Sequence, residues 1–378
     1  MRKPFYAAVI ALAAVCLTGC LGSGESGSGA SQLDASGSGG SLASGGGTAT
    51  LVDLAAQMAP LASTGRRTIR EVGCASGICV VTAGRIAAVT FDGKTFKAAD
   101  MFANLAPALR PNDTAYPIGN WLVACSSRSF CLAVGQSDTS SYSVWNGSTW
   151  TGAISPTPIY PQEKTIACPA DGTCYVVSGT GTDMGTIVTF THGGWVSTGA
   201  QVANNSSLTC ANTTYCYVHE GAAGRTWRFD GSNATRVATP VSNSGKALLT
   251  LTCARGPFCV GVTIDDGILF EDTGAGLHPA TGPTTPLLAV DQQGCLGRGF
   301  CLVQATPTVQ HPLGTAVLSG STATMLDDKS STNTGVHFLT FEAACLSTSV
   351  CIAPPEPDIL GDAPDTTTGV FPTTLFDN

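Results

Sequence analysis

Charged side chains are scarce in this sequence. Only 12% of its 378 residues are Asp, Glu, Lys or Arg, whereas 43% are hydrophobic. Disordered chains usually combine high charge with few apolar residues, so this composition argues against general disorder. Basic residues number 18 against 26 acidic ones, and the formal net charge is -8. Because nucleic-acid binding depends on Lys and Arg that neutralise phosphates, we expect no nucleic-acid partner.

Helical periodicity and long apolar runs are also missing. The repeats described below carry no apolar stripe at i, i+3, i+4 and i+7, so we expect strands in them. The apolar run from Phe5 to Leu17 is shorter than the roughly 20 residues that cross a bilayer. This length disfavours an N-terminal transmembrane anchor, the alternative to the signal peptide described below.

One motif occurs seven times: a cysteine, four or five residues, a second cysteine and then apolar residues. The pairs are Cys74 and Cys79, Cys125 and Cys131, Cys168 and Cys174, Cys210 and Cys216, Cys253 and Cys259, Cys295 and Cys301, and Cys345 and Cys351. Four-stranded propeller blades need about 40 to 50 residues each, which matches the spacing of the first cysteines. The sequence predicts an all-β, seven-bladed β-propeller with four-stranded blades over residues 48–378.

The paired cysteines have two interpretations. Zinc cysteines are usually separated by two to four residues, and a second cysteine or histidine pair follows them at zinc-finger spacing; no pair follows at that spacing here. Disulfides persist in oxidising compartments and need no second pair. We therefore favour one disulfide within each blade, between its first and second strands, where it would fix the strand register.

A second signal has the same period as the cysteine pairs. Phe91 to Phe96 and Trp145 to Trp150 place Asp-Gly and Asn-Gly between aromatic residues. These dipeptides favour type I′ hairpin turns, so we predict such a turn between the third and fourth strands of each blade.

The N-terminus has the features of a secretory signal peptide: two basic residues, an apolar run and small residues. Leu17-Thr18-Gly19-Cys20 resembles the lipobox of bacterial lipoproteins. The resemblance implies cleavage before Cys20 and a diacylglyceryl thioether on its sulfur, and hence lipid anchoring to a bacterial membrane outside the cytoplasm. Residues 1–20 would form this signal, and the Gly- and Ser-rich residues 21–47 a flexible linker without structure.

The last blade lacks an obvious fourth strand. Residues 48–54 are similar to the outer strand predicted at 321–327, so we expect them to complete the seventh blade. The alternative is that residues 373–378 fill that place and residues 48–54 pack elsewhere.

The cysteine hairpins and the W-N-G-S-T-W turn resemble secreted bacterial propellers of the broad kelch-like and sialidase-like group. Trp145 stands where the sialidase Asp-box has its aspartate, so the likeness to that box is incomplete. A sialidase-like enzyme would need an arginine cluster, a tyrosine and acidic partners. Arg128, Arg255 and Arg298 are the best arginine set, although we favour structural or solvated roles for them.

Two insertions interrupt the repeat and are candidate binding loops, because function often lies on loops of a rigid scaffold. Residues 101–120 contribute Phe102, Arg110 and Tyr116, and we expect Trp121 to belong to the core. Residues 354–366 contribute an acidic set that is a candidate Ca²⁺ site or, in the alternative we favour, a solvated loop: Glu356, Asp358, Asp362 and Asp365. An ordinary blade places both insertions on the face opposite the cysteine loops.

No catalytic residue is identifiable. The five histidines occupy unrelated repeat positions without metal-like spacing, and His219 is expected to be packed or hydrogen-bonded. No G-x-S-x-G motif is present. We expect a cell-envelope lipoprotein whose propeller is a non-catalytic binding or assembly module for protein or glycan. The alternatives are a carbohydrate-active hydrolase or lyase with its site at the central channel, and a spacer of the cell surface.

Overall fold

The computed structural model describes residues 48–53, 71–93, 95–111, 121–135, 141–156, 159–179, 184–204, 206–221, 224–239, 241, 248–254, 256, 258–263, 267–282, 287–305, 314–325, 344–348, 350–352 and 370–375. All of them belong to one compact unit, Leu42–Asn378. Within these ranges the regular elements are strands, apart from the short 3-10 helix η2 (Pro107–Leu109).

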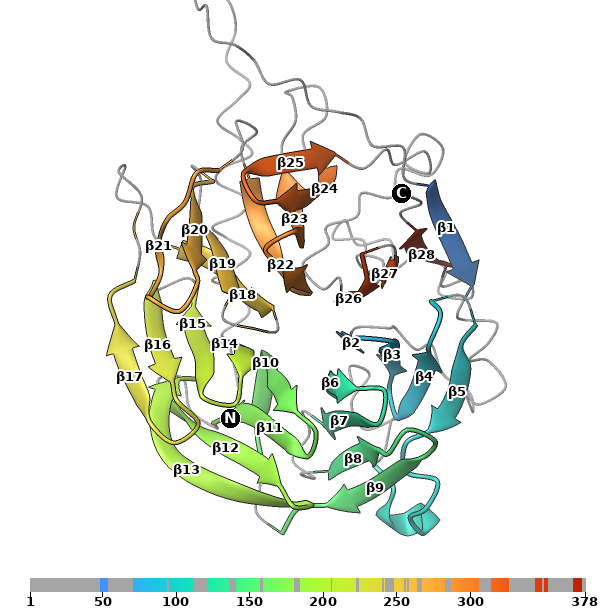
Figure 1. Cartoon of the computed structure of the whole chain (residues 1–378). Coiled ribbons are helices and arrows are strands. Elements are labelled where there is room, and N and C mark those ends of the chain that lie inside the picture. Colours follow the sequence, from blue (N-terminus) through green and yellow to red (C-terminus); the bar gives the residue numbers. More distant parts are fainter. Residues whose placement is uncertain are drawn as a thin grey trace, which may run out of the picture. The chain divides into compact units, whose positions relative to one another are not determined.

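Five separate sheets have four antiparallel strands each, set around a common centre (Figure 1). The strands of the first three are β2 (Glu71–Ala75), β3 (Ile78–Ala83), β4 (Ile86–Thr90) and β5 (Lys97–Asp100); β6 (Trp121–Ser127), β7 (Phe130–Gly135), β8 (Ser141–Trp145) and β9 (Trp150–Ile154); and β10 (Pro161–Ala170), β11 (Thr173–Ser178), β12 (Met184–Thr191) and β13 (Gly194–Ala203). The next two contain β14 (Ser207–Asn212), β15 (Tyr215–Glu220), β16 (Arg225–Phe229) and β17 (Ala234–Val237); and β18 (Leu248–Ala254), β19 (Phe258–Thr263), β20 (Leu269–Asp272) and β21 (His278–Pro279). Each sheet has the predicted meander order.

The sixth sheet has eight strands in the order β1-β28-β27-β26-β22-β23-β24-β25. These are β22 (Leu287–Gly297), β23 (Phe300–Ala305), β24 (Gly314–Ser319), β25 (Thr322–Met325), β26 (Ala344–Ser347), β27 (Val350–Ile352), β28 (Val370–Leu375) and β1 (Thr48–Asp53). The sequence predicted seven separate blades, whereas the described strands form six sheets. The difference has a local cause, because a parallel bridge between Gln293 and Ala344 joins the inner strands β22 and β26.

Strand β1 provides the fourth strand beside β28. The two pair antiparallel over their full length, from Thr48 opposite Leu375 to Asp53 opposite Val370. The segment predicted to complete the last blade therefore does so, and residues from the two ends of the described chain meet in one sheet. Strand β28 lies one place further inward, between β27 and β1.

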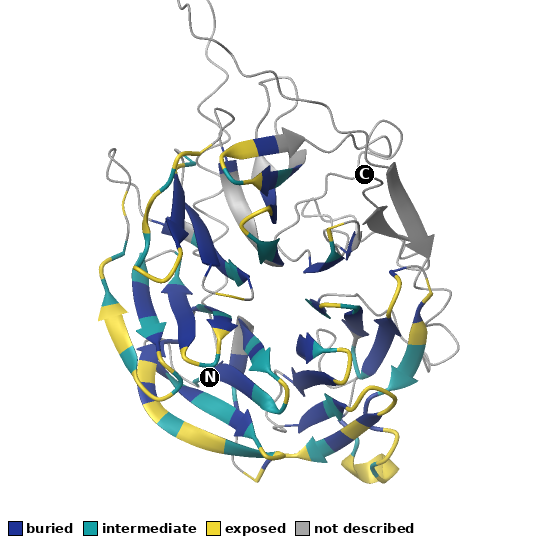
Figure 2. Cartoon of the chain, in the orientation of Figure 1, coloured by how far each residue is buried: buried dark blue, intermediate teal, exposed yellow. Residues whose placement is uncertain are grey.

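The core lies between neighbouring sheets. Inner strands are covered on both faces, so β7 is buried at every position and reads as a continuous apolar run. The outermost strand β17 is exposed or half-buried throughout, and Figure 2 shows this change from inner to outer strands. Packing of Val72 with Ala344 and Ile352 joins the first sheet to the last, which closes the ring.

The outer turn between β12 and β13 agrees with the predicted type I′ geometry, which needs positive φ at both central residues: His192 has a φ of 50° and Gly193 a φ of 77°. The Asn-Gly turn between β8 and β9 differs from the prediction. Gly147 has a φ of 95°, but Asn146 is not in this region. The Asn146 side-chain oxygen instead accepts hydrogen bonds from the backbone amides of Ser148 and Thr149, at 3.0 Å each. The turn is thus held by an Asn side chain, and the Asn-Gly signal located it correctly but assigned the wrong type.

Candidate functional site: the central cavity

A cavity of about 410 Å³ lies where the inner strands converge, and all seven cysteine repeats contribute to its wall. The first cysteine of each pair lines it: Cys74, Cys125, Cys168, Cys210, Cys253, Cys295 and Cys345. Alanine, leucine, isoleucine, proline, serine and threonine side chains complete the lining.

The disulfides explain why sulfur surrounds this cavity. All seven predicted pairs are bonded, each between the first and second strands of its four-stranded unit. The second cysteine of each pair is no more than 2% exposed, whereas the first lies at the wall. Since the bridge crosses between directly paired residues in most units, such as Cys74 and Cys79, it fixes the register of the inner strand.

The described lining residues include no acidic, basic, histidine or tyrosine side chain. Its polar groups are hydroxyls of residues such as Ser76 and Thr209, together with backbone atoms. The Thr209 hydroxyl accepts a hydrogen bond from the amide of Cys253 at 2.7 Å, which links the fourth and fifth sheets. The described part of the wall is therefore uncharged.

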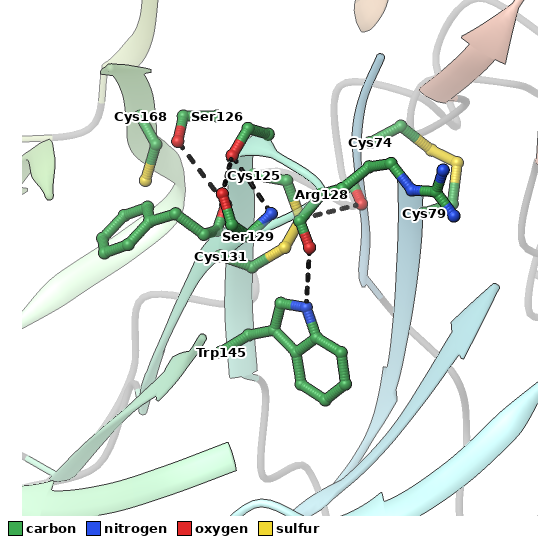
Figure 3. Close-up of a disulfide and its surroundings, with 12 residues drawn as sticks. Cys74, Cys79, Cys125, Ser126, Arg128, Ser129, Cys131, Trp145 and Cys168 are labelled. Atoms are coloured by element: carbon green, nitrogen blue, oxygen red, sulfur yellow. Dashed lines mark hydrogen bonds between the residues drawn. A yellow bond between two sulfur atoms is a disulfide. The ribbon is translucent and has the colours of Figure 1, made fainter. Parts of the chain in front are cut away.

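Two members of the predicted arginine set contact the preceding sheet. The Arg128 guanidinium lies 4.7 Å from the ring centre of Phe91, and its carbonyl accepts a hydrogen bond from the Trp145 indole at 3.1 Å (Figure 3). Arg298 forms an ion pair with Glu271 at 3.3 Å. Arg255 lies outside the described residues. The structural interpretation therefore holds for Arg128 and Arg298, which link neighbouring sheets.

A group of serines binds one carboxylate at the cysteine loops. Asp171 accepts hydrogen bonds from the hydroxyls of Ser126, Ser127 and Ser129, at 2.5, 2.8 and 3.2 Å. The serines belong to the second loop and Asp171 to the third. These bonds connect two neighbouring loops, and Asp171 is solvent-exposed.

A buried acidic site that the sequence did not indicate lies between the fourth and fifth sheets. Asp272 is fully buried and accepts hydrogen bonds from the hydroxyls of Tyr215 and Tyr217, the latter at 2.6 Å. Its other oxygen accepts from the amides of Gly274 and Gly276 at 2.7 and 2.9 Å. The only signal in the sequence was the Asp-Thr-Gly turn, and nothing there indicated the tyrosines more than 50 residues away.

Burial and hydrogen bonding have opposite effects on the pKa of Asp272, but burial and the bond to Asp272 both raise the pKa values of the two tyrosines. Burial by itself would raise the pKa of Asp272, but the four donors outweigh it and hold the pKa of this carboxyl below its usual value. Burial, aided by the bond to Asp272, raises the pKa of Tyr215 to about 12 and raises the pKa of Tyr217 as well. The tyrosines are therefore neutral donors to a carboxylate at physiological pH.

The histidines do not form a site in the part of the chain that is described. His219 is 2% exposed and its ring nitrogens contact the Thr226 hydroxyl at 3.0 Å and the Leu248 carbonyl at 3.2 Å. The expectation of a packed, hydrogen-bonded histidine is confirmed. His192 and His278 are exposed in separate sheets, and His311 and His337 lie outside the described residues.

Phe102 cannot line a binding patch as predicted. It is fully buried beside Trp121, with ring centres 4.8 Å apart, and Trp121 belongs to the core as expected. Phe102 occupies space left by Gly152, where a Cβ atom would lie 2.3 Å from its ring. Asn104 fastens the same segment to the outer strand β9 through two bonds to the Gly152 backbone, at 2.8 and 2.9 Å.

Arg110 also has a structural role. It donates hydrogen bonds to the carbonyls of Leu105 and Ala103, both at 2.9 Å, and lies 3.6 Å from a carboxylate oxygen of Asp100. These contacts close the segment that begins at Met101. The remaining predicted binding residues lie outside the described residues: Tyr116, Glu356, Asp358, Asp362 and Asp365. The candidate Ca²⁺ set thus stays a prediction.

Two general findings concern the described residues. They contain no group of three or more His, Cys, Asp or Glu side chains arranged to hold a metal ion. They also contain no helix that is long and apolar enough to cross a membrane.

The fold is similar to that of several solved propellers. A catalytically inactive virginiamycin B lyase from Staphylococcus aureus superposes with a TM-score of 0.53 at 12% identity, covering 87% of this chain and 99% of that one. YCF48 from Cyanidioschyzon merolae has a TM-score of 0.52 at 10% identity and covers 83% of this chain and 97% of its own. The WD40 domain of Doa1 has a TM-score of 0.51 at 9% identity and covers 84% of this chain and 95% of its own. No family model and no curated protein matches the sequence. These likenesses show a β-propeller fold and carry no information about activity.

Proposed function

We propose that this chain is an extracytoplasmic binding or assembly module for protein or glycan and that its ring is not catalytic. The observation that carries the proposal is the wall of the central cavity, whose described residues are uncharged: one cysteine from each of the seven disulfides, with small or apolar side chains. The seven disulfides also support an oxidising location outside the cytoplasm.

The alternative, a carbohydrate-active hydrolase, needs titratable groups at the reacting bond. Glycosidases generally use two carboxyl groups about 5 to 10 Å apart on either side of that bond. A proton can be transferred only by a side chain within hydrogen-bond reach. The described part of the cavity wall offers no such group, so this observation disfavours the hydrolase.

We further propose that the ring consists of seven four-stranded blades. Each of the five separate sheets has one disulfide hairpin, and the eight-stranded sheet has two. Its halves are joined by a single bridged pair, Gln293 and Ala344. This is the support for treating the halves as the sixth and seventh blades.

We also propose that Cys20 is lipidated and anchors the module to a bacterial membrane. Its support is the lipobox-like sequence and the even number of cysteines that remain after it. Radioactive palmitate should label the wild-type chain and not Cys20→Ser, which should leave the membrane fraction. Cys16→Ser is the matched control and should be labelled normally; labelling of Cys20→Ser would overturn the anchor.

The binding role can be tested on the face that carries the first insertion. The replaced segment must spare residues 101–111, because Phe102 and Asn104 belong to the folded ring. We would replace residues 112–119 with a Gly-Ser linker, crosslink intact envelopes and identify bound proteins, with a glycan array in parallel. The control replaces Ser148 and Thr149 in an outer turn.

We expect a specific protein or glycan to bind the wild-type and control chains and to be lost from the 112–119 variant at unchanged thermal stability. Retained binding would exclude this face. Turnover of glycosidic substrates by the purified chain would instead support the hydrolase.

A further inference from the structure

The central cavity has an unusual wall for its position. The first cysteine of each of the seven disulfides lines one partly open space of about 410 Å³, beside apolar side chains that include Leu208, Leu296 and Leu346. Cavities of about 300 to 1,000 Å³ are of the size that holds small molecules. The cavity is thus large enough for a compact organic ligand.

The absence of charge from the described wall selects against ionic ligands. A buried charge without a partner loses its hydration and gains no ion pair in return. The hydroxyls and backbone groups at the wall can each hydrogen-bond a neutral ligand. A charged ligand would therefore bind more weakly than a neutral one of the same shape.

Sulfur atoms favour aromatic contacts in particular. Sulfur near an aromatic ring, at about 5 Å, contributes about 0.3 to 1.5 kcal/mol per contact. A ring on the axis of the molecule can approach several cystines at once, because every repeat places its first cysteine at the wall. Aliphatic ligands of equal area lack this contribution.

We propose that the central cavity binds a neutral, aromatic small molecule. This proposal rests on the proposed binding function. It adds a small-molecule ligand in the central cavity to the protein or glycan partner on the insertion face. A substitution at Ser76 can test ligand entry, because this residue is exposed and lines the cavity from the first cysteine loop.

The test uses two probes that share one aromatic scaffold. N-phenyl-1-naphthylamine is neutral, and 8-anilinonaphthalene-1-sulfonate adds one negative charge to the same rings. Both fluoresce more strongly in apolar surroundings, so titration of the oxidised chain that follows Cys20, without detergent, gives affinity and stoichiometry. We expect one neutral probe per chain and at least about tenfold weaker binding of the sulfonate.

Three variants test whether the fluorescence signal comes from probe bound in the cavity. Ser76→Trp should reduce affinity for the neutral probe at least about tenfold by filling the entrance. Ser232→Trp, on an exposed outer turn, is the matched control and should bind like wild type. Ser76→Lys should strengthen sulfonate binding relative to the neutral probe, because it supplies the missing counter-charge.

Several results would overturn the site. These are no saturable binding of the neutral probe, equal affinity for both probes, unchanged binding in Ser76→Trp, or equal losses in Ser76→Trp and Ser232→Trp. Partner capture through residues 112–119 is measured independently. If capture succeeds while the probes fail, only the cavity ligand is wrong; if capture fails while the probes bind as expected, the partner face is wrong and the cavity stands.

Discussion

Replacing Asp272 with Asn should strongly destabilise the contact between the fourth and fifth sheets. The carboxylate is fully buried and accepts four hydrogen bonds, from Tyr215, Tyr217, Gly274 and Gly276. Asn keeps the shape but loses the negative charge, and its NH₂ group must face either the hydroxyls or the backbone amides. Since backbone amides cannot turn away, at least one tyrosine hydroxyl has to reverse.

The magnitude follows from the four bonds. A hydrogen bond to a charged group contributes about 1.5 to 3 kcal/mol, against about 1 kcal/mol for a neutral one. Losing part of this difference at four bonds lowers the free energy of unfolding by about 2 to 4 kcal/mol. Equilibrium unfolding in guanidinium chloride, with disulfides intact, measures it.

Asp230→Asn is the matched control. Asp230 holds the corresponding turn of the fourth sheet through the amides of Ser232 and Asn233, but it is solvent-exposed, and the hydroxyl of nearby Tyr175 donates to the Thr213 carbonyl instead. We expect only a small change there. The reasoning fails if Asp272→Asn unfolds at the wild-type midpoint or if the two variants are equally destabilised.

Three further predictions concern stability. Replacing both Cys125 and Cys131 with Ala should lower the free energy of unfolding by about 2 kcal/mol, because a disulfide across six residues restricts the unfolded chain only a little. A denaturant midpoint equal to that of wild type would contradict this. Phe102→Ala should lower the free energy of unfolding by about 3 to 5 kcal/mol, because it leaves a cavity in the core. A change within about 0.5 kcal/mol, the range of most surface substitutions, would contradict the burial of Phe102. The raised pKa values of Tyr215 and Tyr217 contribute stability that is fully present below about pH 10 and decreases above it, and the contribution of Tyr215 is lost as pH rises through about 12. Tyr217→Phe should therefore flatten the fall in unfolding free energy above pH 10, and an unchanged slope would refute the assignment.

The repeat, its strands and the disulfide pairs could all be predicted from the amino-acid sequence. These features are local: Cys74 and Cys79 are five residues apart, so a hairpin of any suitable strands brings them together. The outer turns were located for the same reason, since Asn146 holds amides two and three residues ahead. The place of residues 48–53 in the last sheet also followed from a local likeness between strand sequences, whereas their pairing with β28 came from the structure.

Only the tertiary structure decided what the local patterns could not. The number of sheets depended on the approach of Gln293 to Ala344, and the burial of Phe102 on the space left by Gly152. The tyrosines of Asp272 come from a neighbouring sheet, and the uncharged cavity wall is assembled from every repeat. Such contacts join residues that are distant in sequence. Their energies depend on how the sheets pack against one another, which cannot be predicted from the sequence of one repeat.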